Sequence, residues 1–266
     1  MRVRLLGTGA AANEARHQAC LLVEWGEGSN ASRILLDAGS GMDIVRLLIA
    51  ADCDPAAVSD IFVSHQHFDH VGGLEPLLLW TFLRARGRPP GHETRVYAEP
   101  RILIQIEQLF GAVDTAVPRV FGDKLRWVEA ADGKRLDLAK GATLTMFLVD
   151  HEPPGGGAMG CLIERDGSRL VYSGDTRPTN RLIEAASGAD LLVHEAGGLD
   201  AQGAEIHRYG HSTAGDAGRV AAAAGGGRLI LTHLPADGLE EPMLAEARAA
   251  FGGPVHLASD QTLVEI

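Results

Sequence analysis

The chain has 266 residues and a formal net charge of −11, an acidic balance that argues against a broad nucleic-acid-binding surface, because such surfaces need clustered basic side chains. Apolar residues make up 45% and charged residues 22% of the chain, which is ordinary for a folded globular protein and excludes extended disorder. No apolar run approaches the roughly 18 residues of a transmembrane helix, and three widely spaced cysteines fit a reducing cytoplasm and not a disulfide framework.

Short apolar strands separated by glycine-containing turns recur along the chain. In the first half, the patterns predict strands at 3–6, 20–25, 33–36, 61–63 and 95–98, and helices at 42–51, 74–84 and from about 99 to 110. In the second half, they predict strands at 125–128, 135–138, 143–149, 159–164, 169–172, 191–193, 229–231, 255–257 and 262–266. The strands 159–164 and 169–172 should form a hairpin around Asp166-Gly167. One helix is predicted with Pro178 in its first turn, and a second is predicted to follow a Ser212 or Thr213 cap and to end at Ala224. A last helix is predicted at about 241–250. There is no repeat and no long linker, so we expect one catalytic domain over residues 1–266.

Several predicted strands lead into a polar side chain that can bind metal: His65, His151, Asp175, His194 and His233. Such residues, at strand ends on loops held by a rigid scaffold, are typical of active sites. The densest group is His65, His67, Asp69 and His70, and its side chains suit zinc and, less selectively, iron or manganese. Alternation places the first two on one side of the chain and the last two near a second position, so the spacing favours two metal ions over one.

The run His65-x-His67-x-Asp69-His70 resembles the signature of the metallo-β-lactamase superfamily, and later residues follow that family's order over nearly the whole chain. The resemblance implies an α+β fold, an αββα sandwich of two mixed sheets flanked by helices, with the metal site at one edge. It also implies two divalent ions, zinc first, with manganese or iron as alternatives. The implied ligands of the first ion are His65, His67, His151 and Asp175, and those of the second are Asp69, His70, Asp175 and His233.

Sequence differences between branches of the superfamily restrict the reactions that the resemblance implies. Its β-lactamase members generally lack a bridging aspartate such as Asp175, and its redox members usually carry glutamate at the position of His67. Hydrolysis of a phosphodiester, a thioester or a lactone therefore remains, in which Asp69 would bind metal and also steer the proton of the attacking hydroxide.

Three further motifs resemble the ribonuclease Z branch: Leu6-Gly7-Thr8-Gly9, His194-Glu195-Ala196 and Gly210-His211-Ser212-Thr213. That resemblance implies that His211 protonates the leaving oxygen and that Glu195 orients His211. An alkoxide is a poor leaving group, so a general acid beside the metals is chemically useful. Read without the resemblance, the last motif is a loop and a helix N-cap.

The expected substrate is a small or cyclic phosphodiester, and transfer RNA is less favoured. Endonucleases with a protruding arm insert it between the third histidine and the bridging aspartate. Here Asp175 lies only 24 positions after His151, and the interval includes a glycine-rich turn. The basic stretch from Arg84 through Arg88 to Arg101 reads as a solvated surface, and its contact with substrate is left open. The rival functions are a lactone or thioester hydrolase on the same site, and a non-hydrolytic cofactor-biosynthesis or metal-binding protein. We expect no membrane partner and leave a homodimer open.

Overall fold

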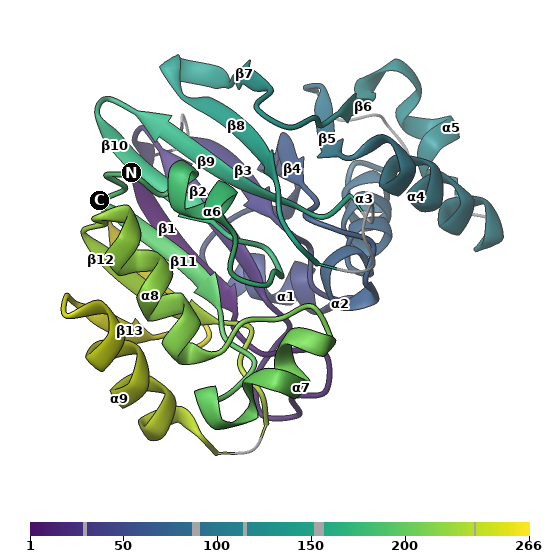
Figure 1. Cartoon of the computed structure of the whole chain (residues 1–266). Coiled ribbons are helices and arrows are strands. Elements are labelled where there is room, and N and C mark those ends of the chain that lie inside the picture. The colour runs from purple at the N-terminus through teal and green to yellow at the C-terminus, as the bar shows by residue number, and fades with distance from the viewer. Residues whose placement is uncertain (29–30, 87–90, 114–115, 152–156, 237) are drawn as a thin grey trace.

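The structure is a computed structural model that describes residues 1–28, 31–86, 91–113, 116–151, 157–236 and 238–266. Within these residues, two seven-stranded sheets pack face to face, and helices cover the outer face of each sheet (Figure 1). The predicted glycine-rich turn at 152–156 and Arg88 lie outside the described residues. The described residues contain no helix long and apolar enough to cross a membrane.

The first sheet is antiparallel at one edge and parallel at the other. Its spatial order is β14 (Thr262–Glu265), β1 (Arg2–Gly7), β2 (Cys20–Trp25), β3 (Ser32–Leu36), β4 (Asp60–Phe62), β5 (Thr94–Ala98) and β6 (Leu125–Glu129). Pairing is antiparallel from β14 to β3 and parallel from β3 to β6. The elements that follow its strands are α1 (Asp43–Ala50), the short turn η2 (Pro55–Ala57), α2 (Phe68–Val71), α3 (Leu74–Arg84), α4 (Pro100–Ala112), α5 (Val117–Phe121) and η3 (Gly122–Lys124).

The second sheet has the same mixed character. Its order is β13 (Val255–Leu257), β12 (Arg228–Thr232), β11 (Leu191–Glu195), β10 (Ser168–Tyr172), β9 (Met159–Arg165), β8 (Thr143–Leu148) and β7 (Arg135–Asp137). Strands β10 to β13 pair in parallel, and β7 to β10 are antiparallel. Its connections contain η4 (Ala139–Gly141), α6 (Asn180–Ala185), η5 (Asp200–Gln202), α7 (Gly203–Arg208), α8 (Ala214–Ala224) and α9 (Glu240–Phe251).

Alternation along the strands explains the layered architecture. In β2, Leu21 and Val23 belong to the core between the sheets, whereas Leu22 packs under the helices of the first sheet. In β10, Leu170 likewise faces the core between the sheets, and Val171 faces the helices of the second sheet. Because successive side chains point to opposite faces, each strand contributes to two cores, and the predicted αββα sandwich of two mixed sheets is confirmed.

Local signals placed most elements, with a few corrections at their ends. The predicted hairpin is present, because Asp166 and Gly167, with φ of 49° and 87°, form the two-residue turn between β9 and β10. The helix predicted around Pro178 instead begins at Asn180, since the Thr179 hydroxyl accepts from the Leu182 amide at 3.1 Å and caps it. Of the two candidate caps for α8, Thr213 is the one that accepts from the N–H of the third helical residue.

Candidate metal centre

The candidate ligands lie on loops that leave strands of both sheets at one edge of the sandwich. His65 to His70 follow β4 of the first sheet and run into α2. His151, Asp175 and His233 follow β8, β10 and β12 of the second sheet. The sandwich therefore brings residues that are up to 168 positions apart in the sequence to one place.

The first cluster comprises His65, His67, His151 and Asp175, each offering one donor atom within 4.8 Å of the others. Nδ1 of His67 lies 2.9 Å from Nε2 of His65 and 3.2 Å from Nε2 of His151. Nε2 of His65 is 3.7 Å from Oδ2 of Asp175. In a tetrahedral site with bonds of about 2.1 Å, donor atoms lie roughly 3.4 Å apart, so this spacing suits one divalent ion.

The second cluster contains Asp69, His70 and His233. Oδ2 of Asp69 is 3.3 Å from Nε2 of His233 and 3.6 Å from Nε2 of His70. Oδ2 of Asp175 lies 3.3 Å from both of these histidine nitrogens, which places this buried carboxylate between the two clusters. The structure thus brings together all seven side chains that the sequence analysis named as ligands.

Hydrogen bonds behind the clusters orient three of the imidazole rings. Nδ1 of His65 bonds the Ser64 hydroxyl at 3.0 Å, and Nδ1 of His151 bonds the backbone oxygen of Gly210 at 2.8 Å. Nδ1 of His70 bonds the carboxylate of Asp37 at 2.8 Å. With Nδ1 as the donor in each case, Nε2 is left as the atom that can bind a metal.

Asp37 is a contributor that the sequence analysis did not identify. This fully buried carboxylate accepts from the Ser64 amide at 2.7 Å, the Ser64 hydroxyl at 2.8 Å and the Tyr172 hydroxyl at 2.7 Å, in addition to His70. Asp37 directly follows β3, so it carries the same signal of an acidic residue at a strand end that singled out Asp175.

The electrostatics of the clusters call for a bound cation. Among the described residues, Nε2 of His70 and Oδ1 of Asp175 are buried without a hydrogen-bond partner. Burial opposes ionisation of Asp175, yet the neighbouring histidines hold its pKa well below the usual range. Burial alone would lower the pKa of His70, but the carboxylates of Asp175 and Asp37 raise it well above its ordinary value. The buried carboxylates thus favour positive charge in the site, and a bound divalent cation would supply that charge.

His211 and Glu195 lie beside the clusters. Nδ1 of His211 is 3.0 Å from Oε1 of Glu195, an oxygen that also accepts from the Thr176 amide at 2.9 Å. Burial lowers the pKa of His211, but the Glu195 carboxylate more than compensates and raises it to about 9. The His211 side chain is 23% exposed, and its ring lies 5.4 Å from that of His233 and stacks on it.

Two histidines behave differently from the expectation. His211 forms a group with Asp175 and His233 that could itself hold an ion, a role that the sequence analysis did not consider. His194 was predicted to follow a strand but lies within β11, one residue before its end. It is fully buried, bonds the backbone oxygen of Glu195 through Nδ1, and belongs to none of the metal-binding groups found among the described residues.

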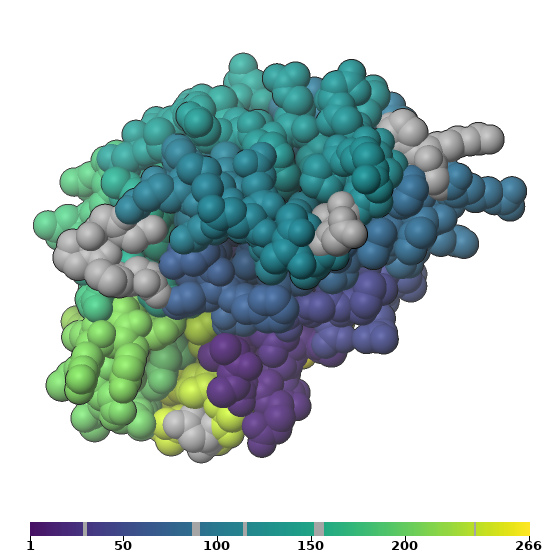
Figure 2. All heavy atoms as spheres, turned by 90° about the vertical axis from the view of Figure 1, so that its right-hand side faces the viewer, coloured from purple at the N-terminus to yellow at the C-terminus, as the bar shows by residue number. Residues whose placement is uncertain are grey.

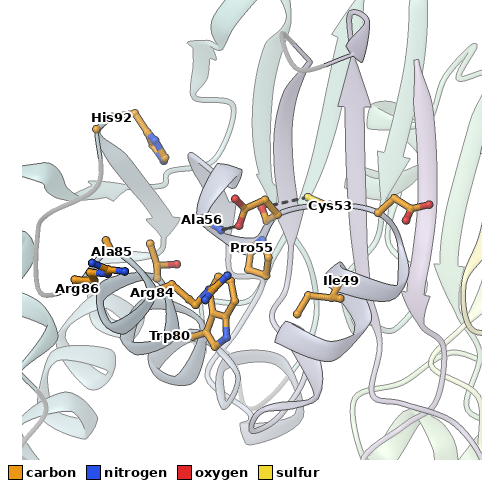
Figure 3. Close-up of a pocket in the computed structure, with 13 residues that line it drawn as sticks. Ile49, Cys53, Pro55, Ala56, Trp80, Arg84, Ala85, Arg86 and His92 are labelled. Carbon is orange, nitrogen blue, oxygen red and sulfur yellow. Dashed lines mark hydrogen bonds between the residues drawn. The ribbon is translucent and has the colours of Figure 1, made fainter.

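Arg84, Arg95 and Arg101 of the basic stretch contact residues other than the candidate ligands. Arg84 and Arg86 line a separate pocket of about 930 Å³ against α1, η2 and α3, in which the Arg84 guanidinium lies 5.8 Å from the centre of the Trp80 ring (Figure 3). Arg95 pairs with Asp60 at 2.7 Å, and Arg101 pairs with Glu99 at 3.3 Å. No candidate ligand lines that pocket.

Comparison with known proteins gives consistent matches. The model of the Beta-lactamase superfamily domain matches residues 32–234. A ribonuclease Z from Haloferax volcanii is 31% identical over 317 residues, covering 100% of this chain and 95% of that protein. The metallo-β-lactamase fold protein YhfI from Bacillus subtilis has a TM-score of 0.84 at 22% identity, over 99% of this chain and 98% of that one. The short form of human tRNase Z has a TM-score of 0.77 at 23% identity, over 100% and 99%.

Proposed function

The chain belongs to the metallo-β-lactamase superfamily and is a metal-dependent, ribonuclease Z-like hydrolase, and from this we propose that it cleaves a small or cyclic phosphodiester at a centre of two divalent ions. Zinc is the ion that the histidine-rich donor set favours. We also propose that residues 1–266 form one catalytic domain. The buried free thiols of Cys20, Cys53 and Cys161 support a cytoplasmic location.

The donor set supports two ion positions. The first would be held by His65, His67, His151 and Asp175, and the second by Asp69, His70, Asp175 and His233. The observation that carries this assignment is the position of Asp175 Oδ2, which lies 3.3 to 3.7 Å from histidine nitrogens of both clusters. Shared in this way, the Asp175 carboxylate would neutralise part of the charge of both ions.

The chain's own residues supply the remaining chemistry. When bound, divalent ions would make water nucleophilic at neutral pH and offset charge on the phosphoryl oxygens. Asp69 can accept a hydrogen bond from the attacking water and so direct a lone pair toward phosphorus. His211 can donate a proton to the leaving oxygen, because its Nδ1 is held by Glu195 and its other ring nitrogen is left for the substrate.

The bond between Glu195 and His211 also favours the acid role over a ligand role for His211. Nδ1 is the His211 atom that comes within 3.9 Å of Asp175, and that same nitrogen bonds Glu195 at 3.0 Å. A nitrogen that carries a proton toward a carboxylate has no lone pair for a metal. We therefore keep His211 outside the ligand set.

The acidic charge balance supports a small substrate. Binding a large RNA takes many cationic contacts with phosphates, and the net charge of −11 disfavours them. Transfer RNA, the substrate class of the tRNase Z relatives, is the competing possibility. The ribonuclease Z relationship favours a hydrolase over the non-hydrolytic alternative.

A direct comparison of substrates tests the proposal. Zinc-loaded protein should hydrolyse bis-p-nitrophenyl phosphate and cyclic nucleotides, chelation should abolish the activity, and precursor transfer RNA should be processed poorly. The variant Asp175→Asn serves as the inactive control, because it keeps the side-chain shape but removes the charge shared by both positions. Efficient, site-specific 3′ cleavage of precursor transfer RNA would overturn the small-substrate assignment. Turnover of lactones or thioesters with none of phosphodiesters would overturn the reaction type.

A further inference from the structure

His233 has an unusual backbone conformation for a candidate metal ligand. Its φ is +53°, in the left-handed region that non-glycine residues seldom occupy. A conformation of this kind persists only where the surroundings impose it. Contacts from other segments must therefore hold the turn that begins at His233, the first residue after β12.

The N-terminal loop between β1 and β2 holds this turn. The backbone amide of Leu234 donates to the backbone oxygen of Thr8 at 2.9 Å, and the backbone amide of Ala10 donates to the backbone oxygen of Leu234 at 3.0 Å. The side-chain amide of Asn13 donates to the backbone oxygens of Leu234 at 2.9 Å and Pro235 at 3.0 Å. Figure 2 shows this N-terminal segment, in purple, beside the C-terminal segment in yellow at the lower edge of the molecule.

Both the amide nitrogen and the amide oxygen of the Asn13 side chain form hydrogen bonds. Asn13 is only 5% exposed, and its Oδ1 accepts from the Ala15 amide at 3.0 Å, which fixes which end of the side chain faces the turn. Both amide hydrogens are thereby directed at the two carbonyl groups that follow His233. A carboxylate of the same shape would have no hydrogen to offer there.

Further contacts of this N-terminal loop fix the position of Asn13. The Thr8 hydroxyl donates to Asp260 at 2.6 Å and accepts from the Arg16 guanidinium at 3.0 Å. Gly9 leaves no room for a side chain, since an added Cβ would lie 2.8 Å from the Cβ of Arg16 and 3.0 Å from that of Asn13. This close approach gives a physical reason for glycine in the motif Leu6-Gly7-Thr8-Gly9, to which the proposed reaction assigns no part.

We propose that Asn13 is a positioning residue for the second metal ion, acting through the backbone of Leu234 and Pro235 to hold His233 in its left-handed conformation. In that conformation Nε2 of His233 lies 3.3 Å from both Asp69 and Asp175. The first cluster contains no residue of this turn, so the effect of Asn13 should be confined to the second position. The inference rests on the proposed assignment of His233 as a ligand.

The test compares Asn13→Asp and Asn13→Ala with the wild type by zinc titration against a competing chelator. Affinity at one of the two positions should fall roughly 10- to 100-fold, as for other groups that orient a ligand, while the other position keeps its affinity. In metal-free protein, the Leu234 amide should exchange with solvent faster in both variants, a readout that needs neither metal nor activity. The matched control is Thr81→Val in α3, which also removes a buried hydrogen bond from a side chain to a backbone oxygen.

The outcomes separate the two hypotheses. Unchanged zinc affinities and unchanged exchange at Leu234 in both Asn13 variants would overturn the positioning role, even if the wild type binds two ions. Equal loss of zinc affinity at both positions, or the same loss in Thr81→Val, would show that the variants act by general destabilisation. Either result would also overturn the positioning role of Asn13. A folded wild type that binds no zinc would instead overturn the proposed metal centre, while the exchange experiment would still report whether Asn13 holds the turn.

Discussion

Replacing Glu195 by glutamine removes the carboxylate that lies 3.0 Å from Nδ1 of His211 and keeps the size of the side chain. The Glu195 charge raises the pKa of His211 to about 9 against the opposing effect of burial. Without that charge, we expect the pKa to fall to its ordinary 6.5 or below. At pH 8 the protonated fraction of His211 then falls from about 0.9 to about 0.03, a loss of about 30-fold in general acid, whereas at pH 5.5 it hardly changes.

The assay is kcat/KM between pH 5.5 and pH 9 at saturating metal for two phosphodiesters. One substrate has an alkoxide leaving group, which needs a proton, and the other releases p-nitrophenolate, which needs little help. Glu195→Gln should lose about 30-fold at pH 8 on the first substrate and far less on the second. His211→Ala should lose roughly 10²- to 10⁴-fold on the first substrate at either pH, the range for a positioned acid.

Metal analysis of the same variants is the control. Both should retain the metal content of the wild type, because neither residue belongs to the proposed ligand set. Equal losses on the two substrates, or a Glu195→Gln defect that persists at pH 5.5, would refute the acid role. Loss of metal from His211→Ala would identify His211 as a ligand, the role that its grouping with Asp175 and His233 also permits.

Elemental analysis of protein purified without chelator should approach two ions per chain, and Asp175→Asn should lower occupancy at both positions, since Oδ2 lies near both clusters. A folded wild type that never exceeds one ion, even with added zinc or manganese, would contradict this. With zinc, the isolated chain should process precursor transfer RNA much more slowly than bis-p-nitrophenyl phosphate, which side-by-side rates on the two substrates would check. In α8, burial raises the pKa of Asp216, but bonds from His207, Arg219 and Thr213 lower it from 3.8 to about 2, so this carboxylate stabilises the fold above about pH 4 and loses that effect as the pH falls through 2. Asp216→Asn should therefore cost about 2 kcal/mol in urea unfolding at pH 7 and little near pH 2, and an equal cost at both pH values would contradict the argument.

Local signals were sufficient where the information is contained within a few residues. The run from His65 to His70 predicts metal binding by itself, because so many ligating side chains in six positions have few other uses. The strands and the Asp166-Gly167 turn were also placed closely, since alternation and positive φ are properties of short segments. His151, Asp175 and His233 carry weak signals alone, and their order along the family's pattern was needed to connect them.

Contacts between distant segments explain what was missed. Asp37 bonds Ser64 and His70, which lie 27 and 33 positions away, and no local pattern ties it to either residue. Asn13 contacts the turn after His233 across 221 positions, so its role becomes visible only in the folded chain. The helix start at Asn180 was misplaced for another reason, because Pro178 is compatible with a first turn but Thr179 supplies the capping oxygen.

The division of the candidate ligands between the two sheets has a thermodynamic consequence. One sheet contributes the segment from His65 to His70, and the other contributes His151, Asp175 and His233, so an ion held by these residues would join the two halves of the sandwich. An ion that binds only the closed sandwich adds about 1.4 kcal/mol of stability for each tenfold rise in free metal above its dissociation constant. The melting temperature of this protein should therefore report the free metal concentration, and metal starvation should expose the apolar layer between the sheets before it unfolds either helical layer.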